Sequence, residues 1–472
     1  MRRQSIAYAC TLSAAALTAT AAAAQDSGAS NAENDEVAVL RAQMEALSAR
    51  VQALESELAA ARAGNTGDTI TTVPTGSQAV SVSETDTPPS INTEIEGDEP
   101  AGPSITFKGA PLIEFENGWS FKPRGRLQFD TGFVLAPKTS QAPDGFGAEV
   151  RRARLGLEGT VPGGFGYKLE VDFAGNEVEV ADALLFYADN GLSITAGHQN
   201  NFQSLEELSS SLHLSFIERA AFTDAFAFTR RLGVSMQYQT GDVLLQAGAF
   251  NDTISRLPDK TYSFDGRAVW LPKIGDAQLH VGGSVHYTNL DSESALRDRQ
   301  RPLVHFTSTR FLDTRTIEAT HELSYGAEFA YISGPFHATG EAYWQNIYRR
   351  DLPDPRFFGG YAETGLFLTR GDTRGYKRGQ FDRIRPTAEV SEGGIGAWQI
   401  VARYDYLNLN DAGIVGGKQN AYLLSLVWTP TDFTRLLLNY GRLAYDDAIF
   451  PLADGSTDYS VDTVGVRAQV DF

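Results

Sequence analysis

The sequence predicts an all-β transmembrane barrel of about 16 antiparallel strands over residues 105–472, preceded by a short α-helical coiled coil and a flexible linker. Two observations predict the barrel. From about residue 105 onward, apolar and polar side chains alternate with a period of two, which gives each strand one face for lipid and one for water. After residue 24, no apolar run reaches the roughly 18 residues that a membrane-spanning helix needs.

The first 24 residues are expected to be a secretory signal peptide. Arg2 and Arg3 precede a short alanine-rich run that ends in small residues before Gln25. Cys10 is the single cysteine and lies inside this segment, so we expect an exported chain with no thiol, disulfide or cysteine metal ligand. A lipoprotein signal at Cys10 is the alternative, but Tyr8 interrupts the small residues that should precede it.

Residues 25–63 are predicted to contain a coiled coil. Apolar residues between 37 and 61 alternate spacings of three and four, a heptad stripe that is buried only against partner helices. Arg50 precedes Glu55 by five residues, and Glu57 precedes Arg62 by five, so opposite charges meet when parallel copies of this chain associate. A single amphipathic helix on a surface is the alternative. The stripe comprises Val37, Leu40, Met44, Leu47, Val51, Leu54, Leu58 and Ala61.

Residues 64–104 are rich in Thr, Ser, Pro, Gly and acidic residues, and we expect a disordered acidic linker. The formal net charge of the chain is −19, which excludes a general affinity for nucleic acid. The segment from residue 105 holds 35 of the 40 basic and 45 of the 59 acidic residues, a net charge of −10. Nearly half of the negative charge therefore lies outside the predicted barrel.

The alternation is clear in residues 124–135, where Leu127, Phe129 and Phe133 are predicted to face lipid and Arg126 and Asp130 to face inward. A half-buried soluble sheet alternates in the same way, so the prediction depends on the number of segments. An even number lets an antiparallel barrel close with both chain ends on one side. The predicted strands are 124–135, 148–161, 164–174, 179–189, 191–199, 232–240, 242–251, 261–271, 276–287, 321–332, 335–347, 358–369, 396–407, 419–429, 433–443 and 461–472.

The predicted connections alternate between tight turns and longer loops, as the two rims of bacterial outer-membrane barrels do. Residues 200–231 and 288–320 are long connections on the long-loop rim, and residues 370–395 are a long connection on the rim of short turns. A barrel of about 16 strands is too wide for its own side chains to fill. The first two segments are therefore candidates for the constriction of a water-filled pore. Structureless insertions of this length, the third segment included, are usually functional.

Arginine dominates the residues predicted to line this pore. Residues 370–385 carry six basic and two acidic residues, and the register points further arginines of the wall inward. Like charges that line a pore select ions locally, and arginine can bind two oxygens of a phosphate or carboxylate. The candidate anion pathway comprises Arg126, Arg152, Arg154, Arg403, Arg435 and Arg467 on the wall, Arg297, Arg299 and Arg301 in residues 288–320, and Arg370, Arg374, Lys377 and Arg378 in residues 370–385. In the alternative, the wall arginines pair across strands with Asp130, Glu158, Glu170, Asp172 and Asp405.

The seven histidines are scattered, with no metal-ligand spacing of the HExxH kind, and the sequence has no nucleophile elbow. We therefore expect no catalytic residues, no metal site and no cofactor. A Ser/His/acid site assembled only in three dimensions is the remaining enzymatic alternative.

Seven strings in the barrel segment together resemble the phosphate-selective porin O and P family. They are VRRARLGLEG at 150, SLEELSSS through SFIER at 204–219, RPLVHFTSTRFLDT at 301, GGYAETGLFLTRGDTRGY at 359, GAWQIVARYDYLNLND at 396, GGKQNAYLLSLVWTP at 416 and VGVRAQVDF at the end. The resemblance implies a homotrimer of 16-stranded barrels in outer-membrane lipid, each with a pore lined by a ladder of arginines and a lysine cluster that holds phosphate.

The resemblance assigns the arginine ladder to Arg151, Arg152 and Arg403, with Arg374 in the matching inserted turn. The loops at 200–231 and 288–320 contain no lysine, and arginine does not replace lysine freely. We expect an outer-membrane porin, that is, a water-filled, anion-selective diffusion channel for small anions such as phosphate or polyphosphate, with its coiled coil in the periplasm. A structural outer-membrane anchor and a nonspecific or cation diffusion pore are the alternatives.

Overall fold

The structure is a computed structural model that describes residues 103–175, 177–256, 260–290 and 295–472. The predicted signal peptide (1–24), the predicted coiled coil (25–63) and all but the end of the predicted linker (64–104) lie outside the described residues.

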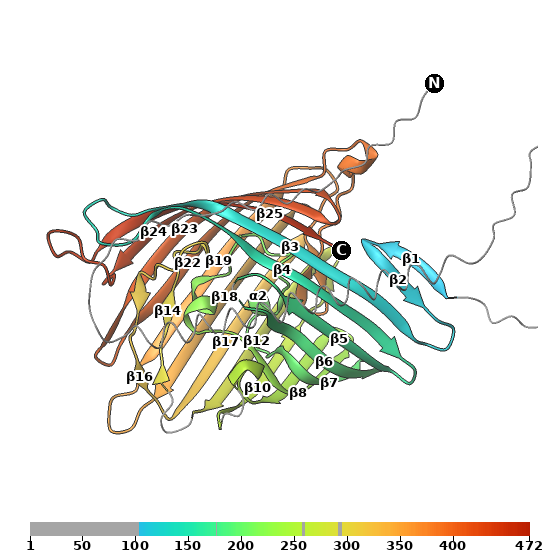
Figure 1. The fold of residues 1–472 in the computed structure, drawn as a ribbon, viewed down its shortest axis with the longest axis horizontal. Coiled ribbons are helices and arrows are strands. Elements are labelled where there is room, and N and C mark those ends of the chain that lie inside the picture. Colours follow the sequence, from blue (N-terminus) through green and yellow to red (C-terminus); the bar gives the residue numbers. More distant parts are fainter. Residues whose placement is uncertain (1–102, 176, 257–259, 291–294) are drawn as a thin grey trace, which may run out of the picture. The chain divides into compact units, whose positions relative to one another are not determined.

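Within the described residues, sixteen antiparallel strands form a closed barrel (Figure 1). Consecutive barrel strands pair with each other, and the last strand pairs with the first, with Val464 opposite Phe133, so the two ends of the sheet are joined. The barrel strands are β3 (Ser120–Leu135), β4 (Gly145–Val161), β5 (Phe165–Asp172), β6 (Glu179–Asp189), β7 (Leu192–Asn200), β8 (Arg230–Thr240), β9 (Val243–Phe250), β10 (Tyr262–Trp270), β12 (Ala277–Asn289), β17 (His321–Ser333), β18 (Phe336–Tyr348), β19 (Arg356–Phe367), β22 (Ala397–Asp411), β23 (Ile414–Thr431), β24 (Thr434–Asp446) and β25 (Tyr459–Asp471).

The predicted strands are confirmed in number and order, because each overlaps one barrel strand. The largest difference lies at β22 and β23, which extend until only Ala412 and Gly413 separate them, although this connection belongs to the long-loop rim. Both residues have positive φ, 51° and 83°, as two-residue hairpin turns require.

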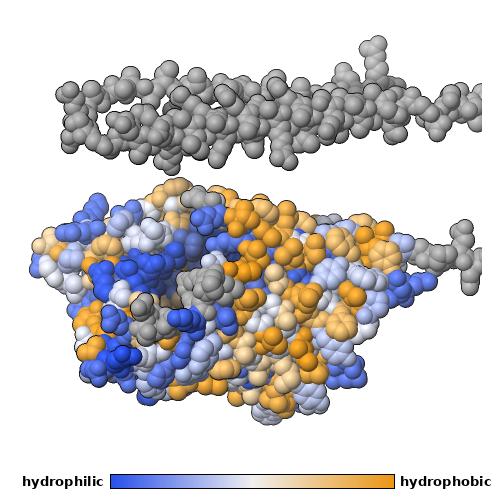
Figure 2. Space-filling view, turned by 60° about the horizontal axis from the view of Figure 1, so that its bottom comes forward, coloured by the Kyte–Doolittle hydropathy of each residue, from blue (hydrophilic) through white to orange (hydrophobic). Residues whose placement is uncertain are grey.

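Side chains of the barrel alternate between an apolar outer face and a polar lumen, as predicted. On β3, Leu127 and Phe133 are each 47% exposed, whereas Gln128 and Asp130 are fully buried inside. In Figure 2, apolar residues spread over the outer face of the strands, and hydrophilic residues gather around a hollow at one end. Among the described residues, no helix is long and apolar enough to cross a membrane.

The connections also divide as predicted. The chain crosses one rim by short turns, for example between β4 and β5 and between β17 and β18, and crosses the other rim by the long loops at 201–229 and 290–320. The connection 368–396 is long although it lies on the rim of short turns, as the sequence predicted. In outer-membrane barrels the short turns face the periplasm.

Two of the three long connections contribute side chains to the main core inside the barrel, and the third contributes Phe381, which shares a smaller cluster with Leu205. Phe222 of the loop 201–229 stacks on Tyr343 of β18, with ring centroids 5.6 Å apart, and Phe311 of the loop 290–320 stacks on Tyr445 of β24 at 5.0 Å. This packing lies on the side of the lumen next to β18–β25. The connections contain α2 (Leu205–Leu208), α3 (Ala221–Ala225), β13 (Ala295–Leu296), β14 (Arg299–Gln300), β15 (Leu312–Asp313), β16 (Ile317–Glu318), β20 (Gly375–Lys377), β21 (Gln380–Asp382) and the 3-10 turn η2 (Val390–Glu392), and η1 (Ile254–Arg256) lies between β9 and β10.

A small hairpin that the sequence did not predict precedes the barrel. Its strands β1 (Ser104–Lys108) and β2 (Ala110–Glu114) continue into β3, where Ile113 pairs with Phe121. Gly109 at the hairpin turn has a φ of 80°, and a Cβ there would lie 2.4 Å from the Phe433 ring. Only glycine therefore lets the hairpin contact the turn between β23 and β24. A second short strand, β11 (Lys273–Ile274), pairs with the start of β12.

Candidate functional site

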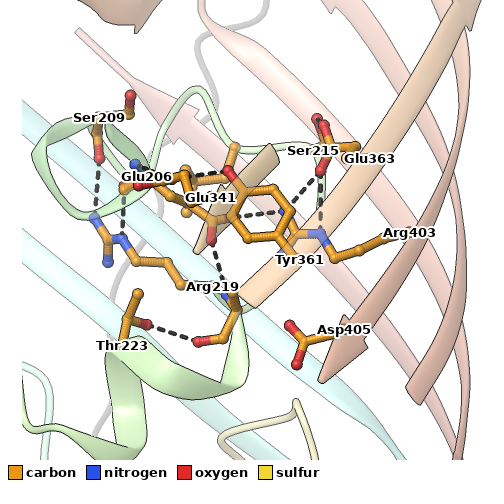
Figure 3. A network of polar contacts seen from close by, with 12 residues as sticks. Glu206, Ser209, Ser215, Arg219, Thr223, Glu341, Tyr361, Glu363, Arg403 and Asp405 are labelled. Carbon is orange, nitrogen blue, oxygen red and sulfur yellow. Dashed lines mark hydrogen bonds and ion pairs between the residues drawn. The ribbon is translucent and has the colours of Figure 1, made fainter. Parts of the chain in front are cut away.

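Buried carboxylates of the wall hold the loop 201–229 inside the lumen (Figure 3). Glu341 on β18 accepts hydrogen bonds from the backbone N–H groups of Leu205 and Glu206, both at 2.9 Å. Asp405 on β22 accepts one from the backbone N–H of Ala221 at 3.1 Å. Because these N–H groups open α2 and α3, the two carboxylates orient both short helices.

Arg403 on β22 lies at the centre of the same network. Its Nη2 donates to Glu206 of the loop at 2.5 Å and to Glu363 of β19 at 2.6 Å. Its guanidinium also lies over the rings of Phe216 and Tyr361, 4.6 and 4.4 Å from their centroids. With its side chain only 2% exposed, Arg403 joins the loop to the wall.

The connection 368–396 meets this loop from the opposite rim. Arg374 Nη1 donates to Ser215 Oγ at 3.0 Å, and this hydroxyl donates to Glu363 at 2.6 Å. The backbone N–H of Phe381 donates to Ser209 Oγ at 3.0 Å. Two loops from opposite rims therefore hold each other inside the barrel.

The loop 290–320 contacts the first loop through Asp224 of α3. The Asp224 carboxylate accepts hydrogen bonds from the backbone N–H of Arg301 at 2.8 Å and from Arg310 Nη1 at 2.6 Å. The three long connections thus form one packed unit, and the open part of the lumen lies between this unit and the wall formed by β3–β9.

Two cavities of about 890 and 880 Å³ lie between the loops and strands β3–β9. The turn-side cavity is bordered by residues 188–193 and 241, which belong to the rim of short turns. The loop-side cavity is bordered by residues 177–181 and 253–255 and by part of the loop 290–320.

The two cavities share four lining residues, and all four are arginines. Arg152 and Arg154 come from β4, Arg219 from the loop 201–229 and Arg230 from the start of β8. Residues that line both cavities lie at the boundary between them. We name them the constriction arginines.

The remaining lining of each cavity is also basic. Eight basic and three acidic side chains line the turn-side cavity, and nine basic and six acidic ones line the loop-side cavity. Both cavities therefore have a positive lining inside a barrel segment whose net charge is −10. Beyond the constriction arginines, the turn-side cavity is lined by Arg124, Arg126, Lys168 and Arg378 and by Asp182, Asp189 and Asp382.

Several of the wall arginines form the cross-strand pairs that the sequence left as an alternative. Arg126 and Arg154 both bind Glu170, at 3.2 and 2.8 Å, and Arg154 also binds Asp172 at 2.7 Å. Arg467 binds Asp130 at 2.6 Å. These pairs reduce the positive field of the wall.

Arg151 and Arg152 both reach the lumen because a β-bulge interrupts the β3–β4 register after Gln128. Arg151 Nε donates to Glu218 of the loop 201–229 at 2.9 Å. Burial alone would raise the pKa of Glu218, but Arg151 and then Arg467 hold that pKa well below its usual range. Arg152 Nη1 donates to the amide oxygen of Gln128 at 2.9 Å, and among the described residues Arg152 has no carboxylate partner.

The other predicted pathway residues divide into three groups. Arg374, Arg403 and Arg435 support the loops, and Arg435 does so by donating to the carbonyl oxygens of Leu212 and Leu214 at 2.6 and 3.1 Å. Arg378 lines the turn-side cavity, and Arg297, Arg299 and Arg301 line the loop-side cavity. Arg370 and Lys377 are exposed and line neither of these cavities.

Sequence reasoning missed two constriction arginines, Arg219 and Arg230. Arg219 donates to the carbonyl oxygens of Glu206 and Ser209 at 3.0 and 2.9 Å, and Arg230 donates to Asp182 of β6 at 2.6 Å. Both lie in or next to the loop 201–229, where no period of two gives the direction of a side chain. Their positions depend on the fold of the loop.

The family model described as phosphate-selective porin O and P matches residues 121–472. An uncharacterised protein of Caulobacter vibrioides is 43% identical over 480 residues, which cover 97% of this chain and 94% of the relative. Porin O of Pseudomonas aeruginosa is 25% identical over 393 residues, which cover 73% of this chain and 88% of the relative. A similar fold is found in the solved trimer form of OmpT, an outer membrane protein of Vibrio cholerae. The alignment has a TM-score of 0.50 and 12% sequence identity, and it covers 75% of this chain and 100% of the OmpT chain.

Proposed function

The chain belongs to the phosphate-selective porin O and P family, and from this premise we propose that it is an anion-selective diffusion channel of the bacterial outer membrane. The observation that carries the proposal is the boundary between the two cavities, where all four shared lining residues are arginines. Fixed cations at a narrow passage raise the local concentration of anions and repel cations.

Arg152 supports the proposal most directly. Its side chain lines both cavities, its hydrogen bond to Gln128 is neutral, and among the described residues no carboxylate lies within ion-pair distance of it. By contrast, Glu170 and Asp172 offset the charge of neighbouring Arg154. A planar guanidinium can donate two parallel hydrogen bonds to a phosphate or a carboxylate.

Phosphate, polyphosphate and small carboxylates are the solutes that this lining suits. Among the described lining residues of the two cavities, Lys168 is the single lysine, and it binds Asp182 at 2.5 Å. The lining therefore favours permeation of many anions past arginines over tight binding of phosphate by a lysine cluster.

The proposed assembly is a homotrimer in outer-membrane lipid, with the predicted coiled coil in the periplasm. OmpT of Vibrio cholerae forms a trimer with a similar barrel, and the heptad stripe between residues 37 and 61 predicts self-association. In this proposal the protein transports solutes and catalyses no reaction.

Planar-bilayer recording under a potassium chloride gradient tests the proposed function. The full chain should give a reversal potential close to the equilibrium potential of chloride. A reversal potential close to the equilibrium potential of potassium would establish a cation pore, and the absence of conductance would favour the structural anchor.

The variant Arg152→Gln tests the residue that supports selectivity most directly. Its chloride-to-potassium permeability ratio should fall by a factor of about two to five, because a unit charge about 4 Å from an ion changes its energy by about 1 kcal/mol in water. Arg442→Gln is the matched control, since Arg442 lies on the outer face of β24 with its side chain 57% exposed and paired with Asp462. An equal fall in both variants would remove Arg152 from the pathway.

A further inference from the structure

The turn-side cavity has two chemically different walls. Strands β3–β5 line it with cations, including Arg124, Arg126 and Lys168. Strands β7–β9 line it with hydroxyls and amides and, apart from Arg230 at the constriction, without charge. These neutral side chains are Ser193, Thr195, Gln199, Asn200, Ser235, Gln237, Gln239 and Gln246.

The neutral side chains form an ordered row on the lumenal face. Ser193 of β7 lies opposite Gln237 of β8, which lies opposite Gln246 of β9. The alternate residues point to the other face, where Met236 and Leu245 are each 49% exposed. The register of three strands therefore places polar groups side by side along the cavity.

Some side chains of this row have hydrogen-bonding groups that no described residue uses. Gln246 is fixed, because it donates to Gln237 Oε1 and accepts from Arg267, both at 2.7 Å. The side chains of Ser193, Thr195 and Gln239 are half-buried, and no hydrogen bond joins them to another described residue. Hydroxyls and amides both donate and accept, so this wall suits a solute that carries hydroxyl groups.

An aromatic ring lies between the two walls. Phe186 of β6 lines the cavity beside Leu184, and in the strand register it lies between Gly166 of β5 and Thr195 of β7. A Cβ at Gly166 would lie 2.2 Å from Phe186 Cζ, so the absence of that side chain lets the ring lie against the barrel wall. The ring offers an apolar surface to the C–H groups of a solute inside an otherwise polar cavity.

We propose that the turn-side cavity binds polyhydroxylated anions, such as sugar acids and sugar phosphates. That the solute is an anion rests on the proposed function. The new part of the inference is that the rest of the solute carries hydroxyl groups. The anionic group lies against the cations of β3–β5, the hydroxyls bind the row on β7–β9, and the carbon skeleton packs on Phe186.

Two pairs of solutes test this proposal with the full-length channel in a planar bilayer. Galactarate and adipate are both six-carbon dicarboxylates, and only galactarate carries hydroxyls. Glucose 6-phosphate and cyclohexyl phosphate give the same comparison for a phosphate ester. For each solute, the measurement is the concentration that halves the chloride current.

The hydroxylated member of a pair should block at a concentration at least about threefold lower, since one net hydrogen bond changes an affinity by roughly this factor. A preference within either pair supports the proposal and identifies the acidic group that the cavity takes. Equal blocking within both pairs would overturn it, even where chloride selectivity shows that the channel itself is anionic.

Variants of the neutral wall assign the effect to this cavity. The double variant Thr195→Val with Gln239→Leu should bring the two members of each pair to equal blocking, and Phe186→Ala should weaken both hydroxylated solutes. Thr253→Val is the matched control, because Thr253 lines the loop-side cavity. Conductance in potassium chloride, recorded for all three variants, reports whether each pore is folded. A preference that persists in the double variant would place the binding elsewhere.

Discussion

Arg374 and Ser215 lie on connections that enter the barrel from opposite rims, and a hydrogen bond of 3.0 Å joins them. Ser215 also donates to Glu363 of β19, so one hydroxyl links two loops and the wall. The width of the open lumen is therefore fixed jointly by the loop 201–229 and by the connection 368–396.

Replacing Ser215 should loosen this junction. Ser215→Ala removes the acceptor for Arg374 and the donor to Glu363, and it leaves both buried groups with one partner fewer. We expect a loss of about 1–3 kcal/mol of unfolding free energy and greater open-channel noise, measured by urea unfolding and single-channel recording. Ser391→Ala, an exposed serine of the same connection, is the control. Identical behaviour of the two variants would show that the junction does not hold the loops.

Replacing Arg403 should have a larger effect. Arg403→Met leaves Glu206 and Glu363 buried without the cation that they share, which should cost about 3–5 kcal/mol in urea unfolding and widen the pore as the loop detaches. The triple variant that adds Glu206→Gln and Glu363→Gln should recover most of the stability, because no buried charge then lacks a partner. Failure of the triple variant to recover would mean that packing of Arg403 on Phe216 and Tyr361 dominates.

The barrel could be predicted because lipid and water impose their alternation on every strand separately. Leu127, Phe129 and Phe133 show the outward period in β3 without any knowledge of a neighbouring strand. The bulge that turns both Arg151 and Arg152 inward could not be predicted in this way, since it depends on how β4 pairs with β3. Arg151 was identified by family resemblance instead.

The sequence predicted which way the arginine side chains point, but it did not predict which residues they bind. Inward register predicted that Arg403 faces the lumen, but its carboxylate partners are Glu206 of a loop and Glu363 of a neighbouring strand. Asp405, one of the carboxylates that the alternative paired with the wall arginines, instead accepts a hydrogen bond from the backbone of Ala221. Which arginines remain available to a solute therefore depends on the tertiary fold of the loops. Arg219 and Arg230 were missed for the same reason.

Arg378 and Lys377 are adjacent cations that the structure distinguishes. Both side chains are exposed, but Arg378 lines the turn-side cavity, whereas Lys377 lines neither cavity. We expect Arg378→Gln to lower the chloride current at low ionic strength by roughly twofold, because a cation at the mouth raises the local concentration of anions. Lys377→Gln should change it less, and the difference should disappear at about 1 M salt, where charges are screened within about 3 Å. A greater effect of Lys377→Gln would contradict the assigned path.

The contact between Glu218 and its two arginines should persist under mild acid. Arg151 and Arg467 hold the pKa of Glu218 well below its usual range, which is near 4.3. A depressed pKa contributes stability above the unfolded value and loses it only as the pH falls through the folded value. The difference in chloride-to-potassium ratio between the wild-type channel and Glu218→Gln should therefore stay constant between about pH 7 and pH 5.5, because His198 and His305, which also line the loop-side cavity, are present in both. Glu218→Gln should raise the chloride-to-potassium ratio at both values, because Arg151 then faces the loop-side cavity without its carboxylate, whereas Arg467 keeps Asp130. A difference that disappears on acidification would show that Glu218 takes up its proton in this range, and that the two arginines do not hold it ionised.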